Sequence, residues 1–467
     1  MEPILQDLIQ LLGKEKVLTG DDLKTRYTHI WKMDQGLSAK AVLLPNTTND
    51  VSKIMGLCDQ YQQGVLVHGG LTNLVGSTET RGDEIVISTE RLNKIEEIDE
   101  SSRTMTVQAG VILENILNAA REKDLLFPQS FGAKGSAQIG GVIATNAGGL
   151  RVFKYGMTRN LALGLEVVLA DGRIINSMKK IIKDNSAYDL KQMFIGSEGT
   201  LGIITRAVLR LVEAPKSRNS AFVALNNYDS VLQLLKYMDA GSAGNLSSFE
   251  LIWGKAYERM TDPTNQVKAP LPHGYTFYIL LETLGADQKE DHQVLENLLA
   301  TALEKEMIED AVLTHSQSDL DWFWRIREDV NVLRLKNRYD QHFDVSIPLA
   351  TIGRYADEVS HQLKQINGVE EVFIFGHVAD GNIHLIVNKS NENVEVKNKI
   401  NEIVYGPIKS YGGSVSAEHG IGLDKKAYLP LCRTAEEIQL MKQLKKALDP
   451  KGLLNPGKIF DVKKVIG

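Results

Sequence analysis

The sequence predicts an α+β protein with two domains and a shorter C-terminal segment. Its 467 residues exceed what one compact core usually holds. From Val51 to about Val212, segments with helical spacing of apolar residues alternate with short β-branched runs, and the alternation restarts after residues 213–217. We therefore expect a first domain over 1–213, a second over 214–410, and a segment over 411–467 that packs on the first domain and completes the functional site.

The periodicity of apolar residues assigns the individual elements. Helical spacing predicts helices near 1–18, 51–61, 113–123, 228–239, 286–306, 318–337, 350–366, 391–410 and 434–448. Short β-branched or alternating runs predict strands near 65–68, 84–89, 104–108, 221–225, 274–282, 343–347, 371–378 and 382–388.

Composition and charge exclude several classes of function. Lys and Arg number 53 against 59 Asp and Glu, a net charge of −6, whereas nucleic-acid binders usually carry a basic surplus. The two cysteines, Cys58 and Cys432, lie far apart in the chain, so we expect no disulfide framework and a reducing, cytoplasmic location. The N-terminus is acidic from residue 2, unlike a signal peptide, and apolar stretches such as 161–170 are too short for a membrane span.

Glycine clusters stand in loops where backbone could approach a ligand. The first is 67–76, directly after a predicted strand, the second is 132–149, and a third contains Gly196, Gly199 and Gly202. Such loops allow positive φ and expose amide N–H groups, which can surround a pyrophosphate. Each cluster alone is about as consistent with a tight structural turn. Together they favour binding of a large dinucleotide.

The residues of these loops resemble a known flavoprotein domain. Gly132-Ala-Lys-Gly-Ser, Ala144-Thr-Asn-Ala-Gly-Gly-Leu-Arg, Tyr155-Gly, Asp184-Asn and Ile195-Gly-Ser-Glu-Gly-Thr-Leu-Gly-Ile-Ile-Thr are similar to the PCMH-type FAD-binding domain of the vanillyl-alcohol-oxidase type flavoproteins. The most similar branch is the FAD-linked D-2-hydroxyacid dehydrogenases, with D-2-hydroxyglutarate dehydrogenases first and D-lactate and glycolate dehydrogenases further off. The resemblance covers residues 40–460, and it implies a two-domain fold with an α+β substrate cap domain.

The resemblance also implies how FAD is bound. Loop 69–76 would hold the pyrophosphate, and segments 132–149 and 196–205 would line the ribityl chain and the isoalloxazine. Covalently flavinylated relatives carry histidine where this chain has Thr72, so we expect non-covalent FAD; His68 and Leu71 replace the usual Gln or Arg and the usual Asn. The expected FAD contacts are His68, Gly69, Gly70, Leu71, Thr72, Asn73, Gly76, Gly132, Gly135, Ser136, Gly140, Asn146, Gly148, Gly149, Gly199, Ile203 and Asn455.

A histidine-bearing hairpin is predicted over 373–387. Asp380-Gly381 is a strong signal for a two-residue turn, and that turn would place His377 directly opposite His384. Opposed side chains have Cβ atoms about 4.5–5.5 Å apart, close enough for two imidazoles to bind one metal ion. A histidine pair alone is equally consistent with a surface ladder.

The segment Ser416-Ala-Glu-His-Gly-Ile-Gly can supply a third ligand. Two histidines and one carboxylate suit zinc or manganese with open positions for a substrate. Adjacent side chains diverge, so Glu418 and His419 are not expected to bind together, which makes His419 available as a general base. The resemblance implies the same roles: His377, His384 and Glu418 as metal ligands and His419 as the group that takes the proton.

A cationic clamp for the substrate carboxylate is predicted near Arg327. Trp324, Arg327, Asn331 and Arg334 have the spacing of one helix face, and an arginine there could bind a carboxylate by two hydrogen bonds. The alternative is a solvated helix face. The resemblance implies that Arg327 is the clamp and that Asn331 and His342 are substrate-binding, at positions usually held by threonine and lysine. Ile386 stands where the relatives carry asparagine. His342 in place of lysine and Ile386 in place of asparagine both reduce polarity near the distal end of the substrate.

These inferences predict a soluble FAD- and divalent-metal-dependent dehydrogenase that oxidises a D-2-hydroxy acid to the 2-oxo acid by hydride transfer to flavin N5. D-2-hydroxyglutarate or a related acid is the expected substrate, and D-lactate or glycolate is the alternative. The expected electron acceptor is an electron-transfer flavoprotein or a quinone, and a homodimer is possible. A different class, a flavin-containing electron-transfer subunit, is less consistent with the sequence because a pure carrier needs no base.

Overall fold

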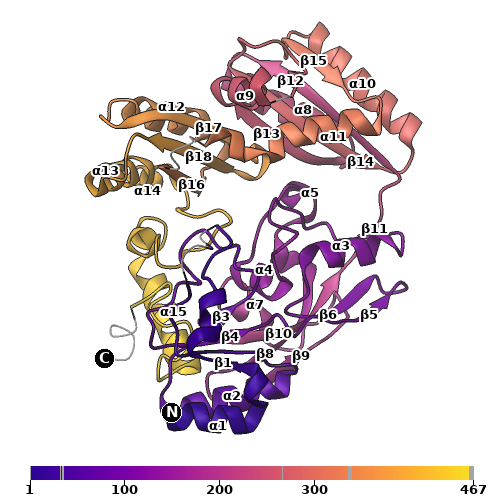
Figure 1. Ribbon diagram of the computed structural model, residues 1–467. Helices are drawn as coiled ribbons and strands as arrows, with labels where there is room; N and C mark the ends of the chain where they lie inside the picture. The colour runs from indigo at the N-terminus through magenta and orange to yellow at the C-terminus, as the bar shows by residue number, and fades with distance from the viewer. Residues whose placement is uncertain (1, 32, 34–35, 266, 335–338, 462–467) are drawn as a thin grey trace. The chain divides into compact units, whose positions relative to one another are not determined.

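The computed structural model describes residues 2–31, 33, 36–265, 267–334 and 339–461 (Figure 1). The chain forms two compact units. Unit 1 consists of Met1–Gly149, Gly156–Ala214 and Glu418–Gly467, and unit 2 consists of Leu150–Tyr155 and Pro215–Ala417. Among the described residues, no helix is both long enough and apolar enough to cross a membrane.

Unit 1 contains two main sheets. The first has the order β1-β2-β4-β3, in which β2, β4 and β3 are parallel and β1 is antiparallel, and the second is antiparallel with the order β5-β6-β10-β8-β9. Its strands are β1 (Val17–Leu18), β2 (Ala41–Leu43), β3 (Val65–His68), β4 (Ile85–Ser88), β5 (Ile95–Asp99), β6 (Thr104–Gln108), β8 (Ala162–Val168), β9 (Ile174–Ser177) and β10 (Ile203–Arg210), with the separate pair β7 (Leu125–Leu126) and β11 (Val212–Glu213).

The helices of unit 1 cover these sheets. Helices α1 and α2 contribute to the apolar core of the parallel sheet, and α3 and α4 to the core of the antiparallel sheet. The helices are α1 (Pro3–Leu12), α2 (Thr48–Tyr61), α3 (Leu113–Arg121), α4 (Ile139–Thr145), α6 (Thr158–Leu161), α7 (Lys191–Phe194) and α15 (Ala435–Leu448). The predicted first helix ends early because Gly13, at φ 92°, is the C-cap of α1.

Unit 2 is built on one antiparallel sheet of seven strands with the order β15-β12-β14-β13-β17-β18-β16 (Figure 1). One face packs against α9 and α11 around Phe222, Tyr278 and Phe375. The strands are β12 (Ser217–Leu225), β13 (Leu246–Trp253), β14 (Phe277–Gly285), β15 (Asp310–Leu313), β16 (Asp340–Ser346), β17 (Val369–Gly376) and β18 (Asn382–Lys389). The helices are α5 (Val152–Tyr155), α8 (Tyr228–Gly241), α9 (Gly254–Met260), α10 (Gln288–Glu304), α11 (Gln317–Glu328), α12 (Ile352–Leu363), α13 (Val394–Tyr405) and α14 (Ile408–Tyr411).

Two further predicted helices differ from the structure. The helix expected over 318–337 ends at Glu328, because Asp329 adopts φ −82° and ψ 68° and a 3₁₀ turn, η4 (Val330–Leu333), follows. Its expected last residues, 335–337, lie outside the described residues. The helix expected over 391–410 is divided into α13 and α14, with Pro407 as the N-cap of α14.

The boundaries of the units also differ from the expected domains in two places. Residues 150–155 belong to unit 2, because Arg151 forms an ion pair with the buried carboxylate of Glu282, with Nε 2.9 Å from Oε1. Residues 411–417 belong to unit 2 as well, because Ser414 bridges to Ser346 at the end of β16.

Candidate active site

The first two glycine loops of unit 1 are in contact with each other. A Cβ atom on Gly70 would lie 1.9 Å from the carbonyl oxygen of Ser136, so only glycine fits where loop 69–76 crosses the second loop. A Cβ atom on Gly140 would lie 2.7 Å from that of Ala109, which brings α4 close to the antiparallel sheet. Both glycines thus allow close approaches of the backbone that a side chain would prevent.

The shape of loop 69–76 is set by one side chain and two unusual backbone angles. Asn73 Oδ1 accepts hydrogen bonds from the amides of Val75 and Ser77, both at 2.9 Å. Leu71 and Gly76 have positive φ angles of 56° and 70°. The loop is therefore held in one conformation by its own residues, with Thr72 partly exposed at its centre.

Asn455 connects the third glycine cluster to β3. Its Oδ1 accepts from the Val67 amide at 3.0 Å, and its Nδ2 donates to the Glu198 carbonyl at 2.6 Å. A Cβ atom on Gly199, which has φ 70°, would lie 2.6 Å from the same Nδ2. Ile203, the first residue of β10, directly follows this cluster in sequence and is buried.

The second glycine loop ends beside Glu418. Asn146 closes α4 in the left-handed conformation, and its Oδ1 accepts from the Arg159 amide at 2.9 Å. A Cβ atom on Gly148 would lie 2.4 Å from Glu418 Oε1, and one on Gly149 would lie 2.4 Å from the Ser130 carbonyl. Close approach therefore requires glycine at both positions.

The residues expected to bind FAD accordingly belong to loops that unit 1 brings together. Gly132 has open space where a side chain would be, and Gly135 and Ser136 continue the same loop. Glycines at close approaches and amides in positive-φ turns are what a dinucleotide pyrophosphate needs. The residues present therefore fit FAD.

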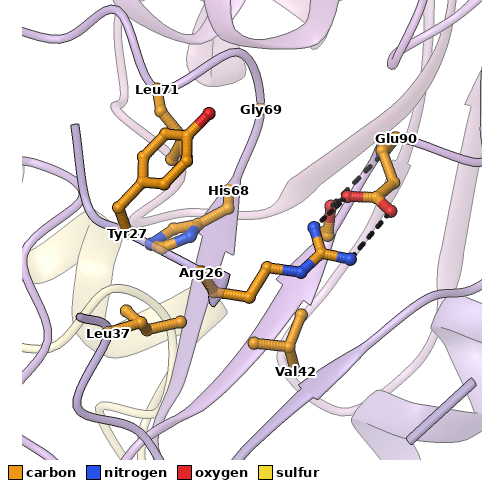
Figure 2. A pocket seen from close by; sticks show the side chains of 9 residues that line it. Arg26, Tyr27, Leu37, Val42, His68, Gly69, Leu71 and Glu90 are labelled. Atoms are coloured by element: carbon orange, nitrogen blue, oxygen red, sulfur yellow. Dashed lines mark hydrogen bonds and ion pairs between the residues drawn. The ribbon is translucent and has the colours of Figure 1, made fainter. Parts of the chain in front are cut away.

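A pocket lies at the end of β3 beside the first loop (Figure 2). The His68 ring is buried there, and its Nε2 lies 2.9 Å from the carbonyl oxygen of Thr78. Burial lowers the pKa of the His68 imidazole to about 4, so the ring is neutral and donates from Nε2. The lining residues are Arg26, Tyr27, Leu37, Val42, His68, Gly69, Leu71, Ser88 and Glu90.

Arg26 and Glu90 form an ion pair in this pocket, with Nη1 2.6 Å from Oε2 (Figure 2). The hydrogen bond to Glu90 raises the pKa of Arg26. The sequence analysis did not single out either residue, because they are 64 positions apart and neither belongs to a motif.

In unit 2 the histidine hairpin is present, but its register differs from the prediction. Phe375, and not His377, is the partner of His384 across β17 and β18. A five-residue connection from His377 to Gly381 replaces the expected two-residue turn: η6 (Val378–Asp380) follows β17, and Gly381 takes the left-handed conformation. The histidines nevertheless remain neighbours, with ring centroids 5.4 Å apart and planes at 85°.

The carboxylate of Glu250 on β13 contacts both His377, a candidate metal ligand, and Arg327, the candidate clamp for the substrate carboxylate. Oε1 lies 2.7 Å from His377 Nδ1, and Oε2 accepts from Arg327 Nε at 2.9 Å. Burial opposes charge on Glu250, but His377 and Arg327 hold its pKa below the usual value. The Arg327 guanidinium also stacks over Phe375, 4.9 Å from the ring centroid.

Glu418 is linked by one peptide bond to Ala417, the last residue of unit 2, whose amide donates to Asp344 at 3.1 Å. One ligand atom each from His377, His384 and Glu418 lie within 4.8 Å of one another, and the same holds for Asp344, Glu418 and His419. The first of these groups is the expected ligand set. Its two imidazoles and one carboxylate fit zinc or manganese.

Asp344 is a second carboxylate that the sequence analysis missed. It is fully buried, it pairs with His384 across β16 and β18, and its Oδ1 lies 3.9 Å from His384 Nδ1. Its position in the strand Asp340–Ser346, on the histidine side, was the available signal.

The remaining substrate-binding candidates lie on different elements. Asn331 is in η4, so the expected continuous helix face from Trp324 to Arg334 does not form. His342 on β16 pairs with Ile386, and its Nε2 contacts the carboxylate of Asp340. Arg334 Nε also donates to Asp340, at 2.9 Å.

Comparison with known proteins identifies the family. A model described as "FAD binding domain" matches residues 39–177, and one described as "FAD linked oxidases, C-terminal domain" matches residues 214–459. The mitochondrial D-2-hydroxyglutarate dehydrogenase of Arabidopsis thaliana is 36% identical over 97% of this chain and 80% of its own length. The chain belongs to the FAD-linked D-2-hydroxyacid dehydrogenase family. This membership confirms the predicted flavoprotein family, with FAD as cofactor, and makes the protein an oxidoreductase.

Two further relatives are named as dehydrogenases of different D-2-hydroxy acids. D-2-hydroxyglutarate dehydrogenase of Xanthomonas citri pv. viticola is 36% identical and covers 98% of this chain and 97% of its own length. A putative mitochondrial D-lactate dehydrogenase of Schizosaccharomyces pombe is 37% identical and covers 89% of this chain and 81% of its own.

Solved structures share the fold of this family member. An alkyldihydroxyacetonephosphate synthase has a TM-score of 0.75 at 15% identity, covering 98% of this chain and 86% of its own. A p-cresol methylhydroxylase has a TM-score of 0.73 at 16% identity, covering 98% and 97%. The predicted vanillyl-alcohol-oxidase type fold is therefore confirmed.

Proposed function

We propose that this protein is an FAD- and divalent-metal-dependent dehydrogenase that oxidises a D-2-hydroxy acid, D-2-hydroxyglutarate or a related acid, to the 2-oxo acid. The observation that carries the proposal is the clustering of His377, His384 and Glu418 within 4.8 Å. Names of relatives that are 36% identical over almost the whole chain support the substrate class.

The donor set defines what each group can do. When bound, FAD would supply an acceptor for the hydride of the alcohol, and zinc or manganese would supply a Lewis acid that lowers the pKa of the substrate hydroxyl. His377, His384 and Glu418 would hold the metal, and His419 would take the hydroxyl proton as a general base. The expected divergence of these adjacent side chains is not observed, because one ligand atom each of Glu418 and His419 lie within 4.8 Å of each other in the group that also contains Asp344. The division of roles between them therefore rests on the family resemblance.

Arg327 would hold the substrate carboxylate. Its Nε donates a hydrogen bond to Glu250 Oε2. Its Nη2 lies 2.8 Å from the same oxygen, but it is buried and not aligned for a hydrogen bond. A substrate carboxylate would supply an acceptor for the remaining guanidinium N–H groups. Asn331 and His342 are proposed to contact the rest of the substrate.

D-lactate is the alternative substrate. Ile386 is buried in an apolar cluster with Phe373 and Phe375, and His342 is already engaged by Asp340. The engaged His342 and the apolar Ile386 offer little polarity for the distal carboxylate of a diacid, and they tolerate a short aliphatic chain. The 37% identical relative is named a putative D-lactate dehydrogenase.

The expected FAD contacts, non-covalent attachment of FAD at the loop containing Thr72, an electron-transfer flavoprotein or quinone as acceptor, a homodimer and a cytoplasmic location all remain predictions. A flavin-containing electron-transfer subunit is disfavoured, because such a carrier has no use for His419 or for a metal-ligand set.

The decisive test is anaerobic reduction of the bound flavin by a panel of acids: D-lactate, D-malate, D-2-hydroxyglutarate and longer aliphatic D-2-hydroxy acids, each with its L-enantiomer as control. Rapid bleaching by a D-acid supports the proposal and identifies the substrate. Bleaching by none of them in metal-replete protein contradicts it.

A further inference from the structure

Glu250 is a buried carboxylate of unit 2 that contacts two groups remote from it in sequence. It lies on β13, and its side chain is 1% exposed. Arg327 is 77 residues away and His377 is 127 residues away. Two distant parts of the chain therefore converge on the carboxylate of Glu250.

The two oxygens of Glu250 have different partners. Oε1 lies 2.7 Å from His377 Nδ1 and accepts from Ser248 Oγ at 2.9 Å, whereas Oε2 accepts from Arg327 Nε at 2.9 Å. We propose that Glu250 is a positioning residue that orients the metal ligand His377 and the carboxylate clamp Arg327 at once. This inference rests on the proposed function, because it assumes that those two residues bind the metal and the substrate.

The hydrogen-bond chemistry explains the orientation of His377. An ionised carboxylate only accepts, so the proton of the His377 ring is on Nδ1 and the lone pair is on Nε2. A metal-binding histidine commonly donates its other ring N–H to a carboxylate, which sets the tautomer and the ring orientation. Glu250 therefore presents Nε2 of His377 as the ligand atom, and the centroid of the His384 ring lies 5.4 Å from that of His377.

The same carboxylate fixes the direction of Arg327. The guanidinium is held between Glu250 and the ring of Phe375, and Phe375 is the cross-strand partner of His384. The cross-strand pair Phe375–His384 thus contains both the ring that supports the clamp Arg327 and the proposed metal ligand His384. A change at Glu250 should disturb metal binding and carboxylate binding together, which a residue that contacts only one of the two groups would not do.

Glutamine at this position tests the proposal with little change of shape. Glu250→Gln keeps one acceptor oxygen, but His377 Nδ1–H and Arg327 both need one, so at least one contact must be lost. Glu250→Asp keeps the charge and shortens the side chain, so it cannot reach both partners, and it serves as the second variant. The matched control is Glu282→Gln, since Glu282 is a buried carboxylate of the neighbouring strand that binds Arg151 and Arg218 instead.

The first measurement is the Zn²⁺ affinity of metal-stripped, FAD-loaded protein in competition with a chromophoric chelator, for wild type, Glu250→Gln, Glu250→Asp, Glu282→Gln and His377→Ala. The second is pyruvate binding, followed through the flavin absorption spectrum. Both Glu250 variants should bind Zn²⁺ about 10–100-fold more weakly, the usual effect of losing a partner of a metal ligand. They should also bind pyruvate more weakly, and Glu282→Gln should match wild type in both.

The outcomes separate the inference from the proposed function. If His377→Ala loses Zn²⁺ while the Glu250 variants bind Zn²⁺ and pyruvate as wild type does, Glu250 is not a positioning residue and the proposed function stands. If His377→Ala itself keeps wild-type Zn²⁺ affinity, the proposed metal site is wrong. Adding Glu250→Gln to His377→Ala should weaken Zn²⁺ binding no further, and an additive loss would also overturn the positioning role.

Discussion

The carboxylate of Glu198 accepts a hydrogen bond from the backbone amide of Ile421 at 2.7 Å. It also accepts from the Gly422 amide at 2.9 Å and from Ser77 Oγ at 2.8 Å. All of these groups belong to unit 1. One buried side chain therefore fixes the segment that follows His419 against the end of the first glycine loop.

Glu198→Ala should destabilise this arrangement. Two amides, one buried and one partly buried, would lose their acceptor. Each unsatisfied buried group costs about 1–3 kcal/mol, so we expect a loss of about 2 kcal/mol in the free energy of unfolding. Urea denaturation followed by flavin fluorescence measures it. Glu436→Ala is the control because Glu436 is exposed on α15. Equal stability of the two variants would contradict the role of Glu198.

Acid precipitation of the purified protein should release all of its flavin as FAD. The glycine loops of unit 1 fit a dinucleotide, and Thr72 offers no histidine nitrogen for a covalent bond. Chromatography of the supernatant distinguishes FAD from FMN. Yellow colour that stays in the protein pellet would show covalent attachment instead.

His377→Ala should remove the metal and abolish turnover while the flavin stays bound, because His377 belongs to unit 2 and the glycine loops belong to unit 1. Metal analysis, the flavin spectrum and steady-state assays measure the three effects. His361→Ala, on the exposed side of α12, is the control. Full activity of a metal-free enzyme would mean that the cluster has no catalytic role.

His419→Ala should slow anaerobic flavin reduction by about 10²–10⁴, the range that general-base catalysis supplies. The metal content should stay near wild type because Glu418 is the proposed ligand, and substrate affinity should change much less than the rate. Stopped-flow reduction at the wild-type rate would exclude His419 as the base. Loss of the metal would make it a ligand.

The stability of the protein should fall in mild acid because of His68. Burial lowers its folded pKa to about 4, below the usual 6.5, so between these pH values the unfolded chain binds a proton that the folded protein does not. Stability contributed by neutral His68 is present above pH 6.5 and is lost as the pH falls towards 4.

His68→Gln tests this dependence, because glutamine can still donate to the Thr78 carbonyl but does not titrate. Between pH 7 and pH 5 the wild type should lose about 2 kcal/mol more unfolding free energy than the variant. Denaturant titrations at both pH values measure the difference. Parallel losses would show that another group dominates.

Local signals in the sequence predicted part of this site. The glycine clusters predicted close backbone approaches, and Gly70 and Gly140 show why no side chain is tolerated there. The hairpin was also predicted, but the register was wrong by two residues. Val378 and Ala379 are buried inside the connection, so the chain takes a longer turn than Asp380-Gly381 suggested.

Long-range partners could not be predicted in the same way. Glu250 is one charged residue in a strand that is otherwise apolar or small, and nothing near it in sequence indicates Arg327 or His377. Its role depends on β13 pairing with β17 and on the packing of α11, which local periodicity does not encode. The break at Asp329 was missed for a related reason, since spacing alone does not show where a helix ends.

The division of unit 1 into separate stretches has a consequence for biosynthesis. Leu454 bridges to Val65, and Asn455 holds β3 beside the third glycine cluster, so unit 1 lacks these contacts until the end of the chain is made. Residues 215–417 of unit 2 form one continuous run. The stretch from the start of β12 to Asn455 is about 240 residues long, and at 5–20 residues per second it takes roughly 10–50 s to translate. The sheet of unit 2 can therefore form before Leu454 and Asn455 reach β3. We therefore expect FAD to enter the nascent protein only after Asn455 has left the ribosome.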